Sequence, residues 1–244
     1  MPIVSQSLNY EVDGASYQAY FAYDSTSTEP CPGVLVIHEW WGVNGYIKSR
    51  VEQLAEAGYV ALAVDMYGQG KMAADPDESG QLMTSVLDNM DVGTVRLRAG
   101  WQLLKDQPQV DECRTAAIGY CFGGAMALHM ARIGCSLKAV ASFHGALGSF
   151  HQAVAHGISS EILVCHGGAD SMVSMDDLDT FKLEMNQVKA NYEVRIFDGA
   201  KHGFTSREAD ANGAAYGLDL GYSELADQQS WDAMISLFKR TLCE

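Results

Sequence analysis

Gly119-Tyr120-Cys121-Phe122-Gly123-Gly124 is the stretch of the sequence that decides the fold. An apolar run at 115–119 precedes it, and an Ala- and Met-rich segment of helical pattern, 122–133, follows it. The pattern G-x-C-x-G is typical of a tight strand-to-helix turn that exposes a nucleophile, with glycines on both sides that let strand and helix approach closely. A helix N-terminus at this point favours the thiolate form of the cysteine. The alternative is a buried structural cysteine in a glycine-rich turn.

Outward from this turn, short apolar runs alternate with longer segments of helical period. The expected strands are 17–23, 34–38, 60–64, 115–119, 138–143, 161–165 and 192–197. The expected helices are 47–57, ended by Gly58, then 76–107 in two pieces broken near 91–93, and 122–133, 174–189 and 222–241. This alternation predicts an α/β fold with a largely parallel sheet covered by helices on both faces. We expect one domain over residues 1–244.

The composition of the chain excludes several classes of binding partner. The chain has 244 residues, 48% of them hydrophobic, and a formal net charge of −15 that disfavours binding to nucleic acid and to anionic membranes. The first residues lack the basic and apolar regions of a signal peptide. Six scattered cysteines without a C-x-x-C pair are typical of a reducing compartment. We therefore expect a cytoplasmic monomer or weak homodimer that acts on a small molecule.

Two further residues complete a candidate catalytic triad with Cys121. Loops at the carboxyl ends of parallel strands carry the chemistry of such sheets. Asp170 follows the strand expected at 161–165, and His202 follows the strand expected at 192–197. The chain order of nucleophile, acid and histidine is the one found in hydrolases with this turn. Taken alone, Asp170 could be a turn cap and His202 a solvated loop residue. Three other acids, Asp176, Asp177 and Asp179, are better explained as carboxylates in the first turn of a helix.

The exit of the strand at 34–38 carries a second acidic candidate. Glu39 lies in His38-Glu39-Trp40-Trp41-Gly42, beside two tryptophans that are expected to line a pocket. In folds with this turn, that loop supplies one backbone amide of an oxyanion hole, here from Trp40, and the residue after the nucleophile, Phe122, supplies the other. The plainer reading of Glu39 is a surface acid.

Five motifs taken together resemble the dienelactone hydrolase family of α/β-hydrolases. They are H-E-W-W-G at 38–42, D-M-Y-G at 65–68, G-Y-C-F-G-G at 119–124, H-G-G-A-D at 166–170 and K-H-G-F at 201–204. The resemblance covers about residues 15–240. It implies an α/β-hydrolase fold, a Cys121–Asp170–His202 triad that needs no cofactor or metal, and hydrolysis of carboxylic esters or lactones. It also implies that Glu39 contacts the thiol and accepts its proton when substrate enters.

Residues beside these motifs are expected to contact the substrate: Trp41, Tyr67, Gln69, Lys71, His144, Phe204, Ser206 and Arg207. Gln69 and Ser206 stand where the family's lactonase has arginines that bind the carboxylate of its substrate. Lys71 and Arg207 lie nearby in the sequence, but a lysine's flexible point charge does not reproduce a guanidinium fork. These departures leave open whether the carboxylated dienelactone is the natural substrate.

Two other functions compete with a cysteine-dependent hydrolase. One is a thiol redox sensor that uses Cys121, although the motif contains no second cysteine to resolve a disulfide. The other is a non-catalytic small-molecule binder on a hydrolase scaffold, against which a complete triad argues. Residues 208–213, with Asp219, are similar to a calcium loop, but the first position is Glu and no helix is expected before it. A polar surface loop is the favoured interpretation of that segment.

Overall fold

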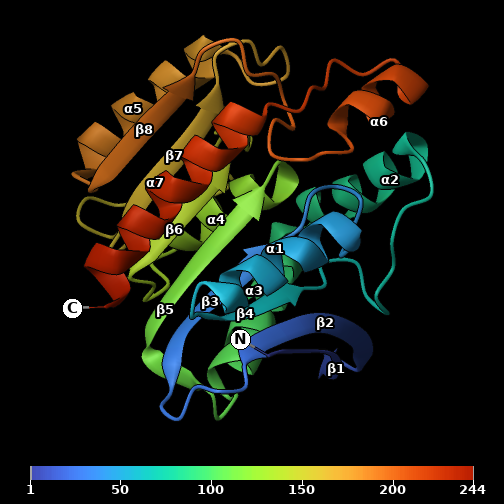
Figure 1. Cartoon of the computed structure of the whole chain (residues 1–244). Coiled ribbons are helices and arrows are strands. Elements are labelled where there is room, and N and C mark those ends of the chain that lie inside the picture. The colour runs from blue at the N-terminus through green and yellow to red at the C-terminus, as the bar shows by residue number, and fades with distance from the viewer. Residues whose placement is uncertain (1, 244) are drawn as a thin grey trace. The chain divides into compact units, whose positions relative to one another are not determined.

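The computed structural model describes residues 2–243, in which eight strands alternate with seven helices (Figure 1). The fold is of the α/β class with a mostly parallel sheet, as the sequence predicts. Chain contacts divide it into two compact units, and the boundary between Ala117 and Ile118 falls within strand β5 (Val110–Tyr120). The expectation of one domain stays a prediction. None of the described helices combines the length and the apolar character needed to cross a bilayer.

In the first unit, the strand order is β1-β2-β4-β3. The strands are β1 (Ile3–Val12), β2 (Ala15–Asp24), β3 (Cys31–Ile37) and β4 (Val60–Val64), and the helices are α1 (Gly45–Glu56), α2 (Pro76–Leu87) and α3 (Met90–Lys105). Strands β3 and β4 pair in parallel, and α1 and α3 pack on them. Because β4 and nearly all of β3 are buried, both read as continuous apolar runs.

The N-terminal strand β1 is absent from the sequence-based expectation. It pairs antiparallel with β2, and most of its side chains are exposed, so its sequence lacks the apolar signal of a core strand. The turn that joins the two strands is Asp13-Gly14, and both residues have positive φ, 50° and 79°. An Asp-Gly pair of this kind is a strong hairpin signal. That dipeptide is the feature by which the hairpin could have been predicted.

The break between the two helices of 76–107 lies earlier than expected. Helix α2 ends at Leu87 and α3 begins at Met90, so the predicted break near 91–93 is wrong by about one turn. The reason is a side-chain cap, since Asn89 Oδ1 accepts a hydrogen bond from the backbone N–H of Val92. Asparagine is among the residues preferred at this position.

In the second unit, three parallel strands follow the carboxyl part of β5, in the order β6-β7-β8. They are β6 (Ala139–Phe143), β7 (Glu161–Gly167) and β8 (Tyr192–Phe197), and the helices are α4 (Phe122–Arg132), α5 (Met175–Val188), α6 (Ala209–Tyr216) and α7 (Glu224–Leu242). Helix α4 packs on β6, and α7 packs on β6 and β7 (Figure 1). The bounds of β8 agree with the prediction, and those of α5 and α7 differ by at most two residues.

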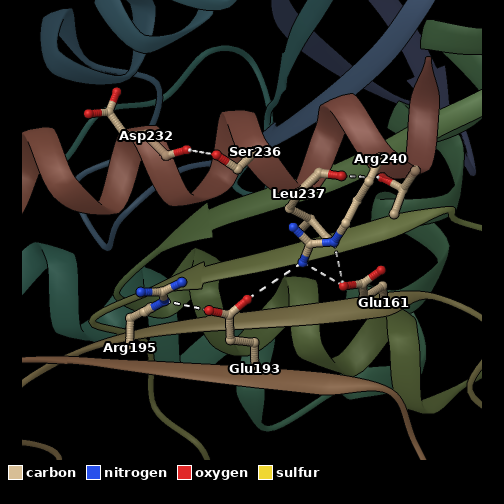
Figure 2. Close-up of polar contacts among 8 residues, drawn as sticks. Glu161, Glu193, Arg195, Asp232, Ser236, Leu237 and Arg240 are labelled. Atoms are coloured by element: carbon tan, nitrogen blue, oxygen red, sulfur yellow. Dashed lines mark hydrogen bonds and ion pairs between the residues drawn. The ribbon is translucent and has the colours of Figure 1, made fainter. Parts of the chain in front are cut away.

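A surface network joins the carboxyl end of α7 to two strands of this unit, as Figure 2 shows. Arg240 Nε donates to Glu161 Oε1 at 2.8 Å, and its Nη2 lies 3.5 Å from Glu193 Oε2. Glu193 also accepts from the guanidinium of Arg195 on the same strand. Exposed ion pairs of this kind contribute little to stability singly.

Helix α6 replaces the polar loop expected at 208–213. It begins at Ala209 and ends before Gly217, whose φ of 68° is a left-handed helix terminus. The chain after it returns to the loop of His202, where the N–H of Gly221 donates to the His202 carbonyl oxygen at 3.2 Å. The segment therefore lies against one of the predicted site residues, and it does not form the calcium-type loop that its sequence resembles.

Two glycines allow the strand-to-helix turn to close. A Cβ atom on Gly119 would lie 1.9 Å from the carbonyl oxygen of Gly123, and one on Gly124 would lie 2.8 Å from the Cα of Gly145. Backbone cannot move away as a flexible side chain can. Close approach therefore explains these two glycines without any appeal to unusual φ angles.

Substituting Gly119→Ala is expected to lower the free energy of unfolding by about 3 kcal/mol, because the new methyl group meets backbone of the first turn of α4. Urea denaturation measures this change. Gly80→Ala is the matched control, since a methyl group there meets no atom within 4 Å and Gly80 lies inside α2. The control is expected to gain about 1 kcal/mol. Equal stability of the two variants would contradict the description of the turn.

Candidate active site

Cys121 occupies the strand-to-helix turn in a strained conformation. Its φ and ψ of 52° and −116° lie outside the usual regions for a residue with a side chain, and such strain clusters at functional sites. The Cys121 N–H donates to the carbonyl oxygen of Phe143 at 3.0 Å, which ties the turn to the end of β6. The residue is the N-cap of α4, and its side chain is partly exposed. The thiol is thus held at a helix N-terminus, where negative charge is stabilised.

The loops that carry Asp170 and His202 are joined backbone to backbone. The N–H of Ala169 donates to the carbonyl oxygen of Ala200 at 2.9 Å. Gly167 permits this approach, because a Cβ atom there would lie 2.5 Å from the same carbonyl oxygen. The parallel pairing of β7 with β8 brings the two loops to the same edge of the unit. The loops that follow β7 and β8, which are far apart in the sequence, are therefore in contact in the structure.

The Asp170 carboxylate is buried and fully engaged. Its Oδ1 accepts from the N–H groups of Met172 at 2.8 Å and Val173 at 3.0 Å, and its Oδ2 lies 2.9 Å from Nδ1 of His202. Burial, the largest single influence, raises the pKa of Asp170, but the hydrogen bonds and the charge of His202 outweigh it and lower the pKa overall. Asp170 is therefore a carboxylate at neutral pH and fixes the orientation of the imidazole.

His202 has only 5% of its surface exposed and sits between this carboxylate and the thiol. Burial, again the largest influence, lowers the pKa of His202, but Cys121 and Asp170 together raise it well above that of a free imidazole. Among residues 2–243, its buried Nε2 atom has no well-aligned hydrogen bond. An imidazole held on one nitrogen and directed on the other toward a thiol can take up and return a proton there.

Four other predicted site residues of the second unit differ in burial and in their contacts with the triad. His144 and Phe204 are fully buried. The centroid of the His144 ring lies 5.2 Å from that of His202 and 5.2 Å from that of Phe204. Ser206 is also buried, whereas Arg207 is exposed and lies over the ring of Tyr222 at 5.7 Å. The roles of these residues in substrate binding stay predictions, as does the oxyanion role of the Phe122 amide.

In the first unit, the Glu39 loop is fixed through its backbone. The buried His38 ring hydrogen-bonds through Nδ1 to the carbonyl oxygen of Glu39, and its Nε2 accepts from the N–H of Met66 at 3.2 Å. Burial lowers the pKa of His38, so the ring is neutral and can accept at Nε2. Glu39 is only 7% exposed, which disfavours its interpretation as a surface acid. Its role toward a thiol stays a prediction.

Asp65 opens the D-M-Y-G motif and organises the turn after it, a role that the sequence analysis does not assign to it. Its buried carboxylate accepts four backbone N–H bonds of 2.8–3.1 Å, which come from Gln18, Tyr67, Gly68 and Gly70. The turn so formed directs the Tyr67 hydroxyl to the carbonyl oxygen of Trp40, at 2.9 Å. An aspartate that opens a short glycine-containing loop is the signal by which this turn could have been predicted.

The remaining predicted contacts of the first unit lie around that turn. Trp41 is half-buried, and its ring centroid lies 5.2 Å from that of Trp40. Gln69 is exposed with a φ of 56°, and Lys71 is paired with Glu78 at 2.9 Å. The Lys71 ammonium is therefore already neutralised by a partner. Within residues 2–243, no group of three or more His, Cys, Asp or Glu side chains is arranged to hold a metal ion.

Comparison with known proteins identifies the family to which the chain is similar. The profile of the dienelactone hydrolase family matches residues 18–242. "Protein usf" of Aquifex pyrophilus is 27% identical over 244 residues, which cover 98% of this chain and all of that protein. The solved structure of a dienelactone hydrolase-like promiscuous phosphotriesterase from metagenomic libraries is 32% identical, with a TM-score of 0.92 over 98% of both chains. A second structure, "m3DLH", is also 32% identical, with a TM-score of 0.93 over 98% of this chain and 99% of that one.

Proposed function

The chain belongs to the dienelactone hydrolase family and is a hydrolase, and from that premise we propose that it cleaves carboxylic esters or lactones through a Cys121 nucleophile. The observation that carries this proposal is the buried connection from Asp170 through His202 toward Cys121. Nδ1 of His202 makes a 2.9 Å hydrogen bond with Oδ2 of Asp170, and Asp170 and Cys121 together raise the pKa of His202. A redox sensor or a passive binding protein needs neither the carboxylate nor the directed imidazole.

The first half of the reaction forms a thioester. The Cys121 thiolate attacks the carbonyl carbon of the substrate, and the carbonyl oxygen becomes an oxyanion. The imidazolium of His202 then gives its proton to the leaving alkoxide, so that the carbon–oxygen bond breaks as an alcohol is released. Asp170 stabilises the imidazolium throughout and remains a carboxylate, as its lowered pKa favours.

The second half returns the enzyme to its starting state. A water molecule gives a proton to the neutral His202 as its oxygen attacks the thioester, and the carbon–sulfur bond breaks to yield the acid product and the thiolate. In a lactone, the alcohol and the acid stay in one molecule, so the product is a hydroxy acid or its keto tautomer. No cofactor enters these steps.

For Glu39 and Trp40, the proposal rests on the family resemblance. Glu39 takes the thiol proton when substrate enters and returns it to the thiolate when product leaves, and the Trp40 and Phe122 amides stabilise the oxyanion. Within the first unit, the support is local, since the His38 and Tyr67 side chains each hold a carbonyl oxygen of this loop. Glu39→Gln keeps the shape of the side chain and removes its ability to accept a proton.

The proposal is tested by turnover of p-nitrophenyl acetate and of the dienelactone, before and after alkylation of Cys121. Peptide mapping identifies the alkylated residue, because Cys31 and Cys113 are also free thiols. Loss of ester hydrolysis in proportion to alkylation of Cys121 supports the proposal. Peroxide-dependent modification of Cys121 without any ester turnover would instead favour the redox sensor, and tight ligand binding without turnover the binding protein.

A specificity prediction concerns the two positions at which the family's lactonase has arginines. Gln69→Arg and Ser206→Arg are each expected to raise kcat/KM for the anionic dienelactone by about 10-fold relative to neutral p-nitrophenyl acetate, because a guanidinium pairs with the substrate carboxylate. The ratio of kcat/KM for the two substrates measures the effect. Gln69→Lys is the control for charge without the planar fork. An unchanged ratio in both arginine variants would contradict the assignment of these positions to the substrate carboxylate.

A second substrate class is favoured by one comparison. The 32% identical structure described as a promiscuous phosphotriesterase covers 98% of this chain. We propose that this chain also accepts neutral phosphotriesters: the same thiolate attacks phosphorus, the aryloxide leaves with the proton of the His202 imidazolium, and water then breaks the phosphorus–sulfur bond to release the phosphodiester. Turnover of paraoxon in wild type, compared with Cys121→Ala, tests this activity separately from ester hydrolysis.

A further inference from the structure

His144 occupies an unusual place directly behind the proposed triad. It follows the last residue of β6 with a φ of 39°, a left-handed conformation that is costly for a residue with a side chain. Its N–H donates to the carbonyl oxygen of Cys165 at 2.8 Å, which ties the residue to β7. The imidazole is fully buried. A strained backbone that is held in place by its neighbours points to a function for the side chain it directs.

The His144 ring contacts the His202 loop at two points. Its Nε2 atom makes a 2.7 Å hydrogen bond with Oγ1 of Thr205, whose surface is only 1% exposed. Its ring meets that of His202 edge to face, with centroids 5.2 Å apart and an interplanar angle of 67°. Thr205 is three residues after His202, so one imidazole holds both ends of the short turn that carries the catalytic base.

Asp170 alone does not determine where His202 points. A single hydrogen bond to Nδ1 does not by itself fix the orientation of the ring about that contact, and the loop between His202 and Thr205 contains Gly203 with a φ of 73°. Glycine makes this loop intrinsically adaptable. A second contact on the ring, anchored at Thr205, removes that freedom. Small displacements of a base are costly in rate, because proton transfer depends on distance and angle.

We propose that His144 and Thr205 form a positioning pair that keeps Nε2 of His202 directed at the Cys121 sulfur. The inference rests on the proposed function for its catalytic meaning, and on the contacts of the second unit for its geometry. Neither residue touches the reacting atoms in this scheme.

Thr205→Val tests the pair, because valine has the shape of threonine but lacks the hydroxyl. We expect kcat for p-nitrophenyl acetate to fall about 10-fold to 100-fold with KM unchanged, and Thr205→Ser to retain most of the activity. His144→Phe keeps a ring against His202 and also lacks the hydrogen bond, so it is expected to resemble Thr205→Val. If the two changes act through one hydrogen bond, the double variant loses no more than either single variant.

A second readout does not require ester turnover. The rate at which iodoacetamide alkylates the Cys121 peptide is followed from pH 5 to pH 9, since the thiolate paired with His202 is the reactive form. In Thr205→Val, we expect the rise in rate to move to higher pH. Thr115→Val is the matched control, because Thr115 is an equally buried threonine that accepts a 3.1 Å hydrogen bond from Trp101 in the first unit. The control is expected to lose stability without any change in the profile.

The two readouts separate the possible failures. A wild-type protein that hydrolyses no ester, with a profile that still moves in Thr205→Val, overturns the proposed function and supports the positioning pair. A Thr205→Val protein with lowered Tm but wild-type kcat and profile shows a merely structural contact and overturns the inference. Additive losses in the double variant would overturn it as well, since the two residues would then act independently.

Discussion

Cys121→Ala is expected to lower kcat for p-nitrophenyl acetate and for the dienelactone by about 10⁴-fold or more, to near the level of a buffer control. The reason is that the thioester cannot form without the sulfur. Stability is expected to change little, because the side chain at this position makes no hydrogen bond that organises the turn. Steady-state hydrolysis with the purified variant measures the loss.

Cys165→Ala provides the control for removal of a thiol in the same unit. Cys165 is fully buried on β7, where burial raises the pKa of its thiol, so it is inert as a nucleophile at neutral pH. Its variant is expected to lose stability through the cavity it creates while it retains kcat. Equal ester turnover in wild type and Cys121→Ala would show that another residue is the nucleophile.

His202→Ala is expected to abolish ester turnover to a similar extent and also to slow alkylation of Cys121 at pH 6 by about 10-fold, since the imidazolium that stabilises the thiolate is lost. The rate of alkylation is expected to approach that of wild type at alkaline pH, where the thiolate forms without help. Alkylation that is as fast at pH 6 in the variant as in wild type would contradict an ion pair between the two residues.

The same variant predicts a pH-dependent difference in stability. A histidine whose pKa is raised by folding stabilises the native state fully below its unfolded pKa of about 6.5, and that contribution is lost as the pH rises through the folded value. The lowered pKa of Asp170 gives a contribution that is present above about pH 4 and is lost as the pH falls through its folded value. The stability difference between wild type and His202→Ala is therefore expected to be largest between about pH 4 and pH 6.5. Urea denaturation at pH 5.5 and pH 9 measures it, and a difference that grows with pH would contradict the assignment.

Much of the fold follows from local sequence. The buried strands were predictable because runs such as 60–64 are apolar throughout. The turn at Cys121 was predictable because glycines flank it, and the structure shows that a Cβ atom on Gly119 would lie 1.9 Å from the carbonyl oxygen of Gly123. Strand β1 was not predicted, since an exposed edge strand has no apolar face to detect. Helix α6 was not predicted either, because Ala209–Tyr216 is short and has little amphipathic pattern.

The positions of the triad residues could be predicted from the sequence, but the side-chain contacts around them could not. Cys121, Asp170 and His202 stand at strand exits, so topology alone predicts that they are brought together. The hydrogen bond between His144 and Thr205 joins two side chains that are 61 positions apart in the sequence. Neither local sequence contains a pattern that predicts it. The same holds for Tyr67 and Trp40, whose link depends on the turn organised by Asp65. A cytoplasmic location and a monomeric or weakly dimeric state stay predictions.

The proposed mechanism passes through a covalent acyl-enzyme on Cys121, and trapping this intermediate is its most direct test. Wild-type protein is mixed with excess p-nitrophenyl acetate, quenched in acid within the first turnover and analysed by intact mass and by peptide mapping. We expect a mass increase of one acetyl group on the peptide that contains Cys121, which disappears as substrate is consumed and is absent from Cys121→Ala. Ester turnover at the wild-type rate with no acyl group on Cys121, or with the acyl group on another residue, would contradict it.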